Sequence, residues 1–316
     1  MDYCLGVFRP LRTKNLGRME ATQESTQPYT DPRRGGLNAS GLLEEDLSDV
    51  ICILHPSSPQ ALEAVAATAR VAPWHILQRD DLEYEVPSTA ALDIALRLSS
   101  NVMDPSRGFC FGRTIGRSDI LLCADNGSKR ISNTHFRIYI TTDSILMLED
   151  VSTNGTIVDN CRLKKRDREN SRMLTNGSVI SVVNGDYATN EVKFVVRLPN
   201  REGFTDLYAK NLQNYLGRVY GGAPGTVQPG RRHPSALSIP PWNSHGMHWS
   251  GGPTYNVTGQ IGKGAFAVVY KLATKQHGAV FAAKELDKRH FMKNGVLNQK
   301  VDNELKIMKD LKHVSD

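Results

Sequence analysis

The sequence lacks the features of a membrane protein and of a disulfide-rich secreted protein. No apolar run approaches the roughly 20 residues that a membrane-spanning helix requires. The amino terminus is basic but shows no apolar stretch followed by a cleavage site, so we expect no signal peptide. The five cysteines are scattered, without the paired spacing of a metal site. We therefore expect free thiols in a reducing, intracellular compartment.

The sequence also lacks a strong excess of one charge. Its 39 basic and 33 acidic residues leave a net charge of +6, which does not by itself argue for nucleic-acid binding. A basic run at residues 162–168 fits a solvated loop as well as a nuclear-import or nucleic-acid patch. The length of 316 residues and the ordinary hydrophobic share of 40% predict two domains, or one domain with long irregular segments.

What the chain does contain is a series of short strands between residues 91 and 198. Apolar and polar residues alternate in several stretches of this region, for example at residues 135–140. Asn-Gly dipeptides, among them Asn154-Gly155 and Asn176-Gly177, separate these stretches as turn signals. Short strands at regular spacing predict a β-sandwich, so we expect a mainly β fold with short helices.

Composition divides the rest of the chain into further segments. They are a disordered tail (1–47), a small α/β extension packing on the sandwich (48–90), an amphipathic helix (199–220), a Gly/Pro-rich linker (221–254) and a last ordered region (255–316). The tail carries Thr22-Gln23 and Thr26-Gln27 near acidic residues. Such Thr-Gln pairs also arise by chance in a tail that contains glutamine. They indicate phosphorylation sites only if the rest of the chain points to phosphorylation.

Small hydroxyl, amide and guanidinium side chains gather at three places where the predicted strands begin or end. Such groups donate hydrogen bonds to an oxyanion, and an arginine adds a positive charge with forked geometry. Because loops at one end of a sandwich can face one ligand, they predict a pocket for a phosphorylated residue. The alternative is that the serine and asparagine residues only cap turns. The candidate phosphate ligands are Arg117, Ser132, Asn133, Thr153 and Asn154.

The motifs Gly-Arg, Ser-x-x-His and Asn-Gly follow one another here in a recognisable order and spacing. They begin at Gly116, Ser132 and Asn154, and residues 91–198 around them resemble a forkhead-associated (FHA) domain. The resemblance implies a β-sandwich that binds phosphothreonine peptides. Arg117 and Ser132 would hold the phosphate, with Thr153 helping.

The resemblance also implies roles for the neighbouring residues. Asn154 would hydrogen-bond the peptide backbone, and Asn133 would contact the peptide near the phosphothreonine. Arg130 lies two residues before Ser132, where such domains often read the third position after the phosphothreonine, so we expect an acidic residue there. Structural roles, in a turn or in tying loops together, would belong to Gly116, His135 and Gly155.

A second set of motifs occupies the last ordered region. A Gly-rich loop at residues 262–269 is followed by Lys284 and then by a helical stretch with Glu304, and together they resemble the N-terminal lobe of a serine/threonine protein kinase. The resemblance implies that the loop covers the ATP phosphates while Lys284 contacts them and pairs with Glu304. The alternative is a Gly-rich hairpin with a surface lysine–glutamate pair. The implied nucleotide-binding residues are Ile261, Gly262, Lys263, Gly264, Ala265, Phe266, Ala267, Val268, Val269, Lys284 and Glu304.

The kinase-like region departs from its family after the helix with Glu304. The sequence has no His-Arg-Asp catalytic loop and no Asp-Phe-Gly segment, so it lacks the catalytic aspartate and the Mg²⁺ ligands. ATP and Mg²⁺ are the implied cofactors, but we expect this chain, truncated within the lobe, to be inactive. Because a partial lobe exposes an apolar face, we expect residues 255–316 to be unstable and to bind ATP weakly at best.

An FHA domain followed by a kinase domain resembles the checkpoint kinases of DNA-damage and meiotic signalling. The resemblance implies a nuclear protein whose Thr22 and Thr26 are phosphorylated and bound by a second molecule, giving phosphorylation-dependent self-association. Ser25 and Tyr29 stand three places after these threonines, so this expectation and the acidic preference assigned to Arg130 do not support each other. The competing interpretation is a non-catalytic phosphothreonine-binding adaptor or competitor. In either case we expect no membrane partner and no direct nucleic-acid partner.

Overall fold

The computed structural model describes most of the two regions that the sequence marks as ordered. Thr22, Thr26, Phe266 and the greater part of the predicted linker lie outside the described residues. The described ranges are 3–5, 42–78, 92–124, 129–183, 191–221, 246–265, 267–286, 288–293 and 296–310.

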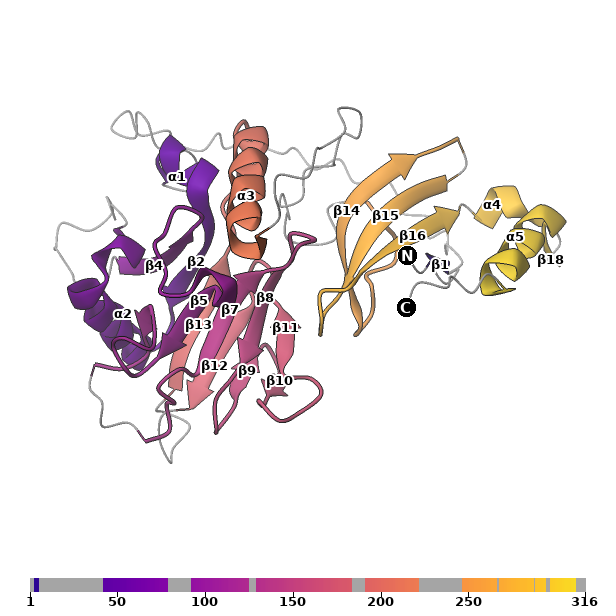
Figure 1. Cartoon of the computed structure of the whole chain (residues 1–316). Coiled ribbons are helices and arrows are strands. Elements are labelled where there is room, and N and C mark those ends of the chain that lie inside the picture. Colours follow the sequence, from indigo (N-terminus) through magenta and orange to yellow (C-terminus); the bar gives the residue numbers. More distant parts are fainter. Residues whose placement is uncertain are drawn as a thin grey trace, which may run out of the picture.

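Two packed sheets form a β-sandwich, which confirms the predicted mainly β fold class (Figure 1). The larger sheet has the strand order β10 (Cys161–Leu163), β9 (Thr156–Val158), β12 (Val179–Val183), β13 (Glu191–Arg197), β2 (Val50–Pro56), β4 (Leu92–Arg97) and β3 (Ile76–Gln78). The smaller sheet has the order β11 (Ser171–Met173), β8 (Leu146–Asp150), β7 (Phe136–Ile140), β5 (Phe109–Gly112) and β6 (Ile120–Leu121).

The hydrophobic core lies between the two sheets. Strand β7 buries every second residue, as a strand with one face on a core must, and these residues are Phe136, Ile138 and Ile140. The Phe136 ring stacks on Phe111 of the neighbouring β5, with ring centroids 4.6 Å apart. Burying each such side chain stabilises the fold by roughly 1.5–3 kcal/mol.

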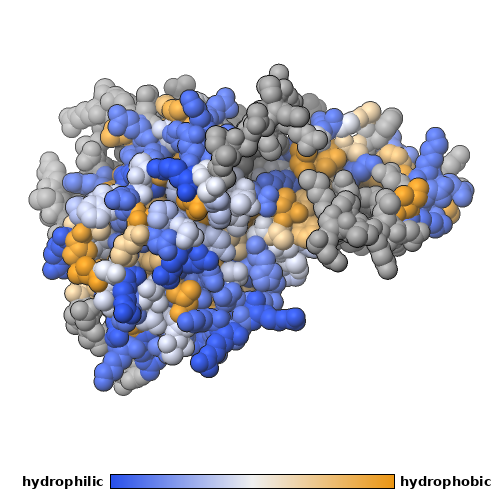
Figure 2. Space-filling model, viewed as in Figure 1, coloured by the Kyte–Doolittle hydropathy of each residue, from blue (hydrophilic) through white to orange (hydrophobic). Residues whose placement is uncertain are grey.

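The surface seen in Figure 2 is mainly hydrophilic, with small separate hydrophobic patches. In the part of the chain that the structure describes, no helix has both the length and the apolar character needed to span a membrane.

The segment predicted as an extension supplies a strand of the larger sheet. Strand β2 lies between β13 and β4 and pairs antiparallel with both, so the sheet does not break at residue 91. Helix α2 (Pro59–Val71) begins where the sequence predicts, because the Ser58 hydroxyl accepts a hydrogen bond from the Ala61 N–H at 3.2 Å. The 3₁₀ turn η2 (Pro73–His75) then leads into β3.

Two short elements overlap the tail, residues 1–47, that we expected to be disordered from the sequence. One is β1 (Tyr3–Leu5), which pairs in parallel with a strand of the second region. The other is α1 (Glu44–Asp49), which is ordered because Leu42 and Leu47 are buried against apolar residues of β2 and β4.

The predicted amphipathic helix is α3 (Thr205–Tyr220), which lays Tyr208, Leu212 and Tyr215 on the sandwich. Just before it lies Arg201, whose side chain is almost completely buried. Its guanidinium donates hydrogen bonds to the carbonyls of Pro199, Val50 and Ile51 and lies 3.8 Å from the centroid of the Tyr208 ring. This arginine therefore ties α3 to β2, and burial lowers its pKa.

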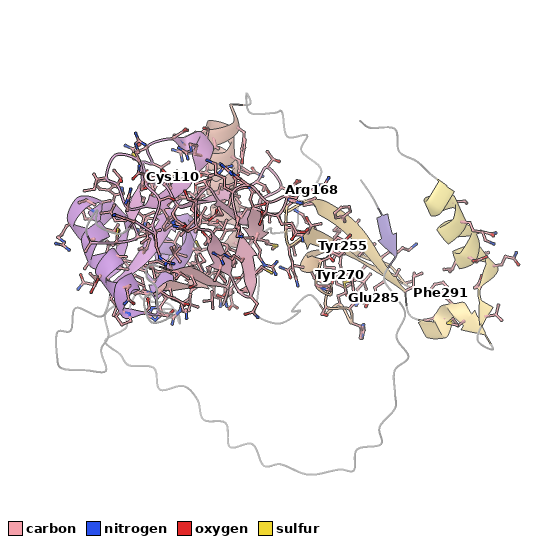
Figure 3. The ribbon with its side chains drawn as sticks, turned by 90° about the horizontal axis from the view of Figure 1, so that it is seen from below. Cys110, Arg168, Tyr255, Tyr270, Glu285 and Phe291 are labelled. Carbon is pink, nitrogen blue, oxygen red and sulfur yellow. The ribbon has the colours of Figure 1, made fainter. Side chains whose placement is uncertain are left out.

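The second region is a separate sheet followed by short elements. Its strands, in spatial order, are β1, β16 (Val280–Leu286), β15 (Ala267–Thr274) and β14 (Tyr255–Lys263). After them come α4 (Lys288–Phe291), β17 (Met292–Lys293), β18 (Val296–Leu297) and α5 (Gln299–Asp310). Figure 3 shows Tyr255, Tyr270 and Glu285 on this sheet, where Tyr255 packs between Trp249 and Phe281.

One end of this sheet packs on the sandwich. The Met173 N–H on β11 donates to the Lys275 carbonyl at 2.6 Å, and the Ser171 hydroxyl donates to the Gln276 carbonyl at 2.7 Å. Beside these bonds, Ile145, Met147 and Met173 of the sandwich form one buried cluster with Ala273, and Val280 packs against it. The sandwich thus covers apolar residues at this end of the second sheet.

Introducing a charge into this cluster is expected to separate the sheet from the sandwich. In Met147→Glu the new carboxylate would be buried against Ala273 without a partner, which costs several kcal/mol, whereas separation returns it to water. We expect limited trypsin digestion to cleave within residues 255–286 several times faster than in the original chain. Leu62→Glu, on the exposed side of α2, is the matched control. Unchanged cleavage in Met147→Glu would show that this contact does not hold the two parts together.

Candidate functional site

Three loops meet around a cavity of about 560 Å³ in the sandwich. The loops follow β5, precede β7 and follow β8, and they place Arg117, Ser132, Asn133, Thr153 and Asn154 around the same space. All five candidate phosphate ligands therefore line one cavity. It also receives four cationic side chains that the sequence analysis does not assign to the phosphate: Arg107, Arg113, Lys129 and Lys165.

The charge of the cavity is strongly positive. Arg107, Arg113, Arg117, Lys129 and Lys165 line it, and no carboxylate stands among the described lining residues. The hydroxyls of Ser132 and Thr153 add neutral hydrogen-bonding groups. A phosphate monoester carries between one and two negative charges at neutral pH and several acceptor oxygens, so its charge and hydrogen-bonding needs match this lining.

His135 connects two of the loops and is completely buried. Its Nδ1 accepts a hydrogen bond from the Ser132 N–H at 3.1 Å, so Nε2 carries the proton and donates to the Gly155 carbonyl at 3.2 Å. The Ser132 hydroxyl in turn accepts from the Thr153 N–H at 3.2 Å. One neutral imidazole thereby fixes Ser132 in place, which is the loop-tying role expected for His135.

The protonation of His135 should make the fold less stable in acid. Burial lowers the pKa of His135 below its usual value, and burial lowers the pKa of His75 to about 4. Below about pH 6.5 these histidines bind protons in the unfolded chain, whereas they stay neutral in the folded chain. The free energy of unfolding therefore falls as the pH drops below 6.5, by up to about 1.4 kcal/mol per pH unit for each histidine. Urea unfolding at pH 7.0 and 5.5 measures the loss.

The variants His135→Gln and His248→Gln separate this effect from general acid sensitivity. The His248 side chain is 78% exposed. We expect His135→Gln to reduce the pH dependence of the unfolding free energy to the part that His75 contributes, and His248→Gln to change it less. An equal pH dependence in the original chain and in His135→Gln would refute the role of His135.

Asn154 and Gly155 form the turn of the third loop. The Asn154 Nδ2 donates to the Arg130 carbonyl at 2.8 Å, which directs its Oδ1 away from that bond as an acceptor. Gly155 has φ +92°, and a Cβ there would lie 2.7 Å from the Leu163 carbonyl oxygen, so only glycine fits. Arg130 contributes its backbone to this contact, whereas its exposed side chain is not among those that line the cavity.

The third loop depends on Asp150, which sequence reasoning missed. This carboxylate is fully buried at the end of β8 and accepts hydrogen bonds from the Ser152 N–H, the Ser152 hydroxyl and the Thr156 hydroxyl at 3.1, 2.9 and 2.6 Å. The Ser152 hydroxyl then accepts from the Gly155 N–H at 2.7 Å. The aspartate therefore sets the loop that carries Thr153 and Asn154.

Gly112 and Arg113 form a second Gly-Arg pair, which sequence reasoning also missed. Arg113 follows β5 directly, and its Nε donates to Asn133 Oδ1 at 3.0 Å. A Cβ at Gly112 would collide with the Asn133 backbone and the Ser118 hydroxyl, so the strand end can approach this loop only as glycine. The signal that could have found the pair is its position at the end of an apolar run, Phe109–Gly112.

Gly116 and Arg117, the pair that the sequence analysis selected, lie four residues further on in an exposed turn. Gly116 has φ +83° with open space around it, in agreement with the turn role expected of it. The Arg117 carbonyl accepts from the Thr134 hydroxyl at 2.8 Å. Its guanidinium makes no hydrogen bond or ion pair with the residues that the structure describes. Both arginines reach the cavity, but only Arg113 is held by Asn133.

Three of the kinase-like residues, Gly262, Val269 and Lys284, lie side by side on the second sheet. Gly262 on β14 pairs with Val269 on β15, which pairs with Lys284 on β16, so Val269 and Lys284 share one face beside the Gly-rich turn. Glu304 lies on α5, with its side chain outside the described set. Among the residues that the structure describes, no group of three His, Cys, Asp or Glu side chains is arranged to hold a metal ion.

Comparison with known proteins identifies the family of the sandwich. The FHA domain model matches residues 109–183, which include the three loops around the cavity. The chain contains an FHA domain. It is also 28% identical over 219 residues to the serine/threonine-protein kinase RAD53 of Saccharomyces cerevisiae, a match that covers 68% of this chain. The chain spans 24% of the length of that relative, so the similarity is distant and partial.

Solved structures that match parts of this chain include one of S. cerevisiae Rad53p and one named Rad53. The N-terminal FHA domain of Rad53p in complex with a phosphothreonine peptide is 30% identical, with 30% of this chain and 69% of that chain covered and a TM-score of 0.25. Rad53 1–466 in complex with AMP-PNP is 23% identical and has a TM-score of 0.32. The match covers 68% of this chain and 45% of that chain.

Proposed function

We propose that this chain binds phosphothreonine-containing peptides through the cavity of its FHA domain. The observation that carries the proposal is the gathering of five cationic side chains and the hydroxyls of Ser132 and Thr153 around one space with no lining carboxylate among the described residues. A rigid sandwich holds the loops, so little ordering is needed on binding. The Rad53p FHA structure with a phosphothreonine peptide supports this ligand class.

Each residue of the cavity has a distinct role in this proposal. Arg113 faces the phosphate as an oriented guanidinium, and Arg117 adds a second charge from its exposed turn. The Ser132 hydroxyl and the Thr153 hydroxyl donate to the phosphate oxygens. Asn154 Oδ1 accepts from a peptide N–H, because its Nδ2 is bonded to the Arg130 carbonyl.

Peptide titration tests the proposal. Three peptide pools with the same degenerate flanking sequence carry threonine, phosphothreonine or glutamate at the central position, and fluorescence anisotropy gives the apparent dissociation constant of each pool. The degenerate flanks avoid choosing a partner in advance. We expect measurable binding of the phosphothreonine pool alone. Equal binding of the three pools would refute the proposed function.

As a second candidate function, we propose that residues 255–310 are the nucleotide-facing part of a protein kinase lobe. The register that places Val269 and Lys284 on one face beside the Gly-rich turn favours it. The whole protein would then be a checkpoint-type serine/threonine kinase in the nucleus that binds phosphorylated Thr22 or Thr26 of a second copy. The alternative is an adaptor that reads phosphothreonine without catalysis.

Nucleotide binding to this chain is expected to be weak. If the dissociation constant for ATP is about 1 mM or more, then ATP at about 1 mM raises the free energy of unfolding by no more than about 0.4 kcal/mol. A thermal shift titration measures this, with Lys284→Ala as the control variant. A large shift that Lys284→Ala removes would contradict the expected weakness, and a large shift that survives in Lys284→Ala would place the nucleotide elsewhere.

A further inference from the structure

Residues 162–169, at the end of β10 and in the connection to β11, form a basic loop. They carry five cationic and two acidic side chains, so their net charge of +3 is half of the +6 of the whole chain. We propose that the basic loop binds the phosphate backbone of a nucleic-acid double helix. This replaces the expectation of no direct nucleic-acid partner, because a net charge averaged over 316 residues hides a local positive surface. The inference does not depend on phosphothreonine binding.

The charged side chains of the basic loop face water. Its five cationic residues are all exposed: Arg162, Lys164, Lys165, Arg166 and Arg168. None of them makes an ion pair with a residue that the structure describes. The Arg162 guanidinium donates to the Asn154 carbonyl at 2.9 Å, which positions it without neutralising its charge. The charges of the loop therefore remain available to an anionic partner.

The backbone of the basic loop is held at several points. Leu163 is buried and anchors the start of the loop in the sandwich core. The Asp167 N–H donates to the Lys164 carbonyl at 2.9 Å, which closes a turn in the middle of the loop. Just beyond the loop, the Asn170 carbonyl accepts from the Asp150 N–H at 2.8 Å. Because the loop is already ordered, binding requires little loss of backbone entropy.

The residue types of this segment favour a double helix over other polyanions. Proteins that bind single strands stack the bases on aromatic side chains, and residues 159–173 contain no aromatic residue. Membrane-binding surfaces add exposed apolar side chains, and no large exposed hydrophobic residue lies in this range. A double helix carries one negative charge per about 1.7 Å of its axis, so several phosphates lie within reach of one loop. Contacts of this kind recognise the backbone and not the base sequence.

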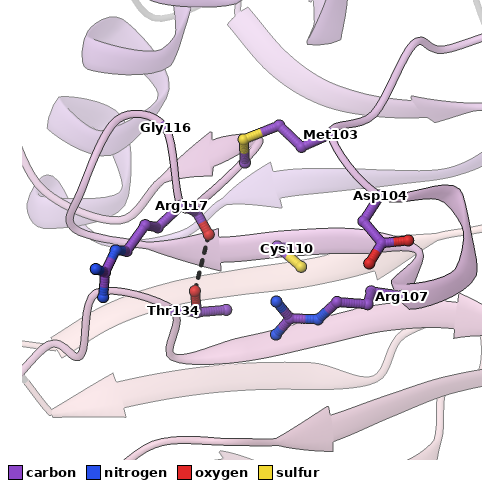
Figure 4. Close-up of a pocket in the computed structure, with 7 residues that line it drawn as sticks. All are labelled: Met103, Asp104, Arg107, Cys110, Gly116, Arg117 and Thr134. Atoms are coloured by element: carbon purple, nitrogen blue, oxygen red, sulfur yellow. Dashed lines mark hydrogen bonds between the residues drawn. The ribbon is translucent and has the colours of Figure 1, made fainter.

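Most of the basic loop lies outside the cavities of the FHA domain. Lys165 lines the phosphopeptide cavity, but the other four cationic residues do not. A smaller cavity of about 370 Å³ beside Arg117 is lined by no residue of the loop (Figure 4). Lys164, Arg166 and Arg168 can therefore be replaced without removing a residue of either cavity.

Fluorescence anisotropy with a labelled DNA duplex of about 20 base pairs, two helical turns, tests the proposal in the full chain. The loop variant combines Lys164→Gln, Arg166→Gln and Arg168→Gln. The control variant combines Arg70→Gln, Arg197→Gln and Lys210→Gln, which remove three exposed cations from α2, β13 and α3 and give the same net charge. Titration with the phosphothreonine pool and thermal unfolding check that both variants keep the fold.

Four phosphate contacts, one for each loop cation outside the cavity, predict a strong salt dependence. The logarithm of the association constant should fall with the logarithm of the salt concentration with a slope of about −3.6, roughly a 100-fold loss between 50 and 200 mM salt. The loop variant keeps one of these contacts, so we expect a slope of about −0.9 and at least about tenfold weaker binding at 50 mM salt. The control variant should keep the slope of the original chain.

Single-stranded DNA, poly-glutamate and duplex RNA are titrated in parallel. Unchanged duplex affinity in the loop variant, or an equal loss in the control variant, would overturn the proposal. Single-stranded DNA or poly-glutamate that bound as tightly as the duplex would also overturn it, because the loop would then not select a double helix. Binding of either duplex through the loop supports the proposal, and binding of neither overturns it.

Discussion

Arg113→Ala is expected to weaken phosphothreonine binding about 100-fold, whereas Arg117→Ala weakens it about fivefold. Arg113 follows a buried strand and is oriented by Asn133, so its charge-assisted hydrogen bonds to the phosphate need little reorganisation. Two such bonds are worth about 3 kcal/mol, or about 100-fold. Arg117 is exposed in a turn and contributes on the scale of a surface ion pair.

Anisotropy titration of both variants with the phosphothreonine pool measures the difference. Arg113→Lys keeps the charge but loses the fork and the bond to Asn133, and we expect it to fall between Arg113→Ala and the original chain. Thermal unfolding of each variant checks that the fold is intact. If Arg117→Ala lost more affinity than Arg113→Ala, the phosphate would be anchored by Arg117, the arginine selected from the sequence. The role proposed for Arg113 would then be wrong.

Arg201→Ala is expected to destabilise the FHA domain by about 3–5 kcal/mol. The substitution leaves three buried carbonyls, those of Pro199, Val50 and Ile51, without the guanidinium that bonds them, and it removes the cation from the Tyr208 ring. A loss of this size is a large part of the total stability of a domain. Urea unfolding followed by circular dichroism measures it.

Arg197→Ala is the control for Arg201→Ala. Arg197 ends β13 and is largely exposed, and replacing it removes one charge without opening the buried network. We expect Arg197→Ala to change the free energy of unfolding by less than about 1 kcal/mol. A loss for Arg201→Ala no larger than for Arg197→Ala would show that the buried guanidinium does not hold α3 to the sandwich.

The strands and helices of the sandwich could be predicted because they depend on local patterns. The alternation in Phe136–Ile140, the Ser58-Pro59 start of α2 and the turn at Gly155 each follow from the chemistry of neighbouring residues. The sequence predicts β2 as a strand but not its position between β13 and β4. That position could not be predicted because β2 and β13 pair residues that lie more than 100 positions apart in the chain.

The candidate site could be predicted in part for the same reason. Ser132, Thr153 and Asn154 were found from their spacing, and all three line the cavity. Asp150 and Arg201 gave no local signal, since their importance comes from burial among distant backbone groups. Two Gly-Arg pairs, Gly112-Arg113 and Gly116-Arg117, lie four residues apart in the sequence. Arg113 was missed because only the fold shows that Gly112 ends a buried strand.

NMR titration of the ¹⁵N-labelled chain with a phosphothreonine peptide shows where on the sandwich the peptide binds. We expect the largest amide shifts in the three loops of the cavity, at residues 113–117, 132–134 and 153–154, and we expect the unphosphorylated peptide to cause none of them. Shifts that concentrate elsewhere on the sandwich, or equal shifts with the unphosphorylated peptide, would contradict this expectation.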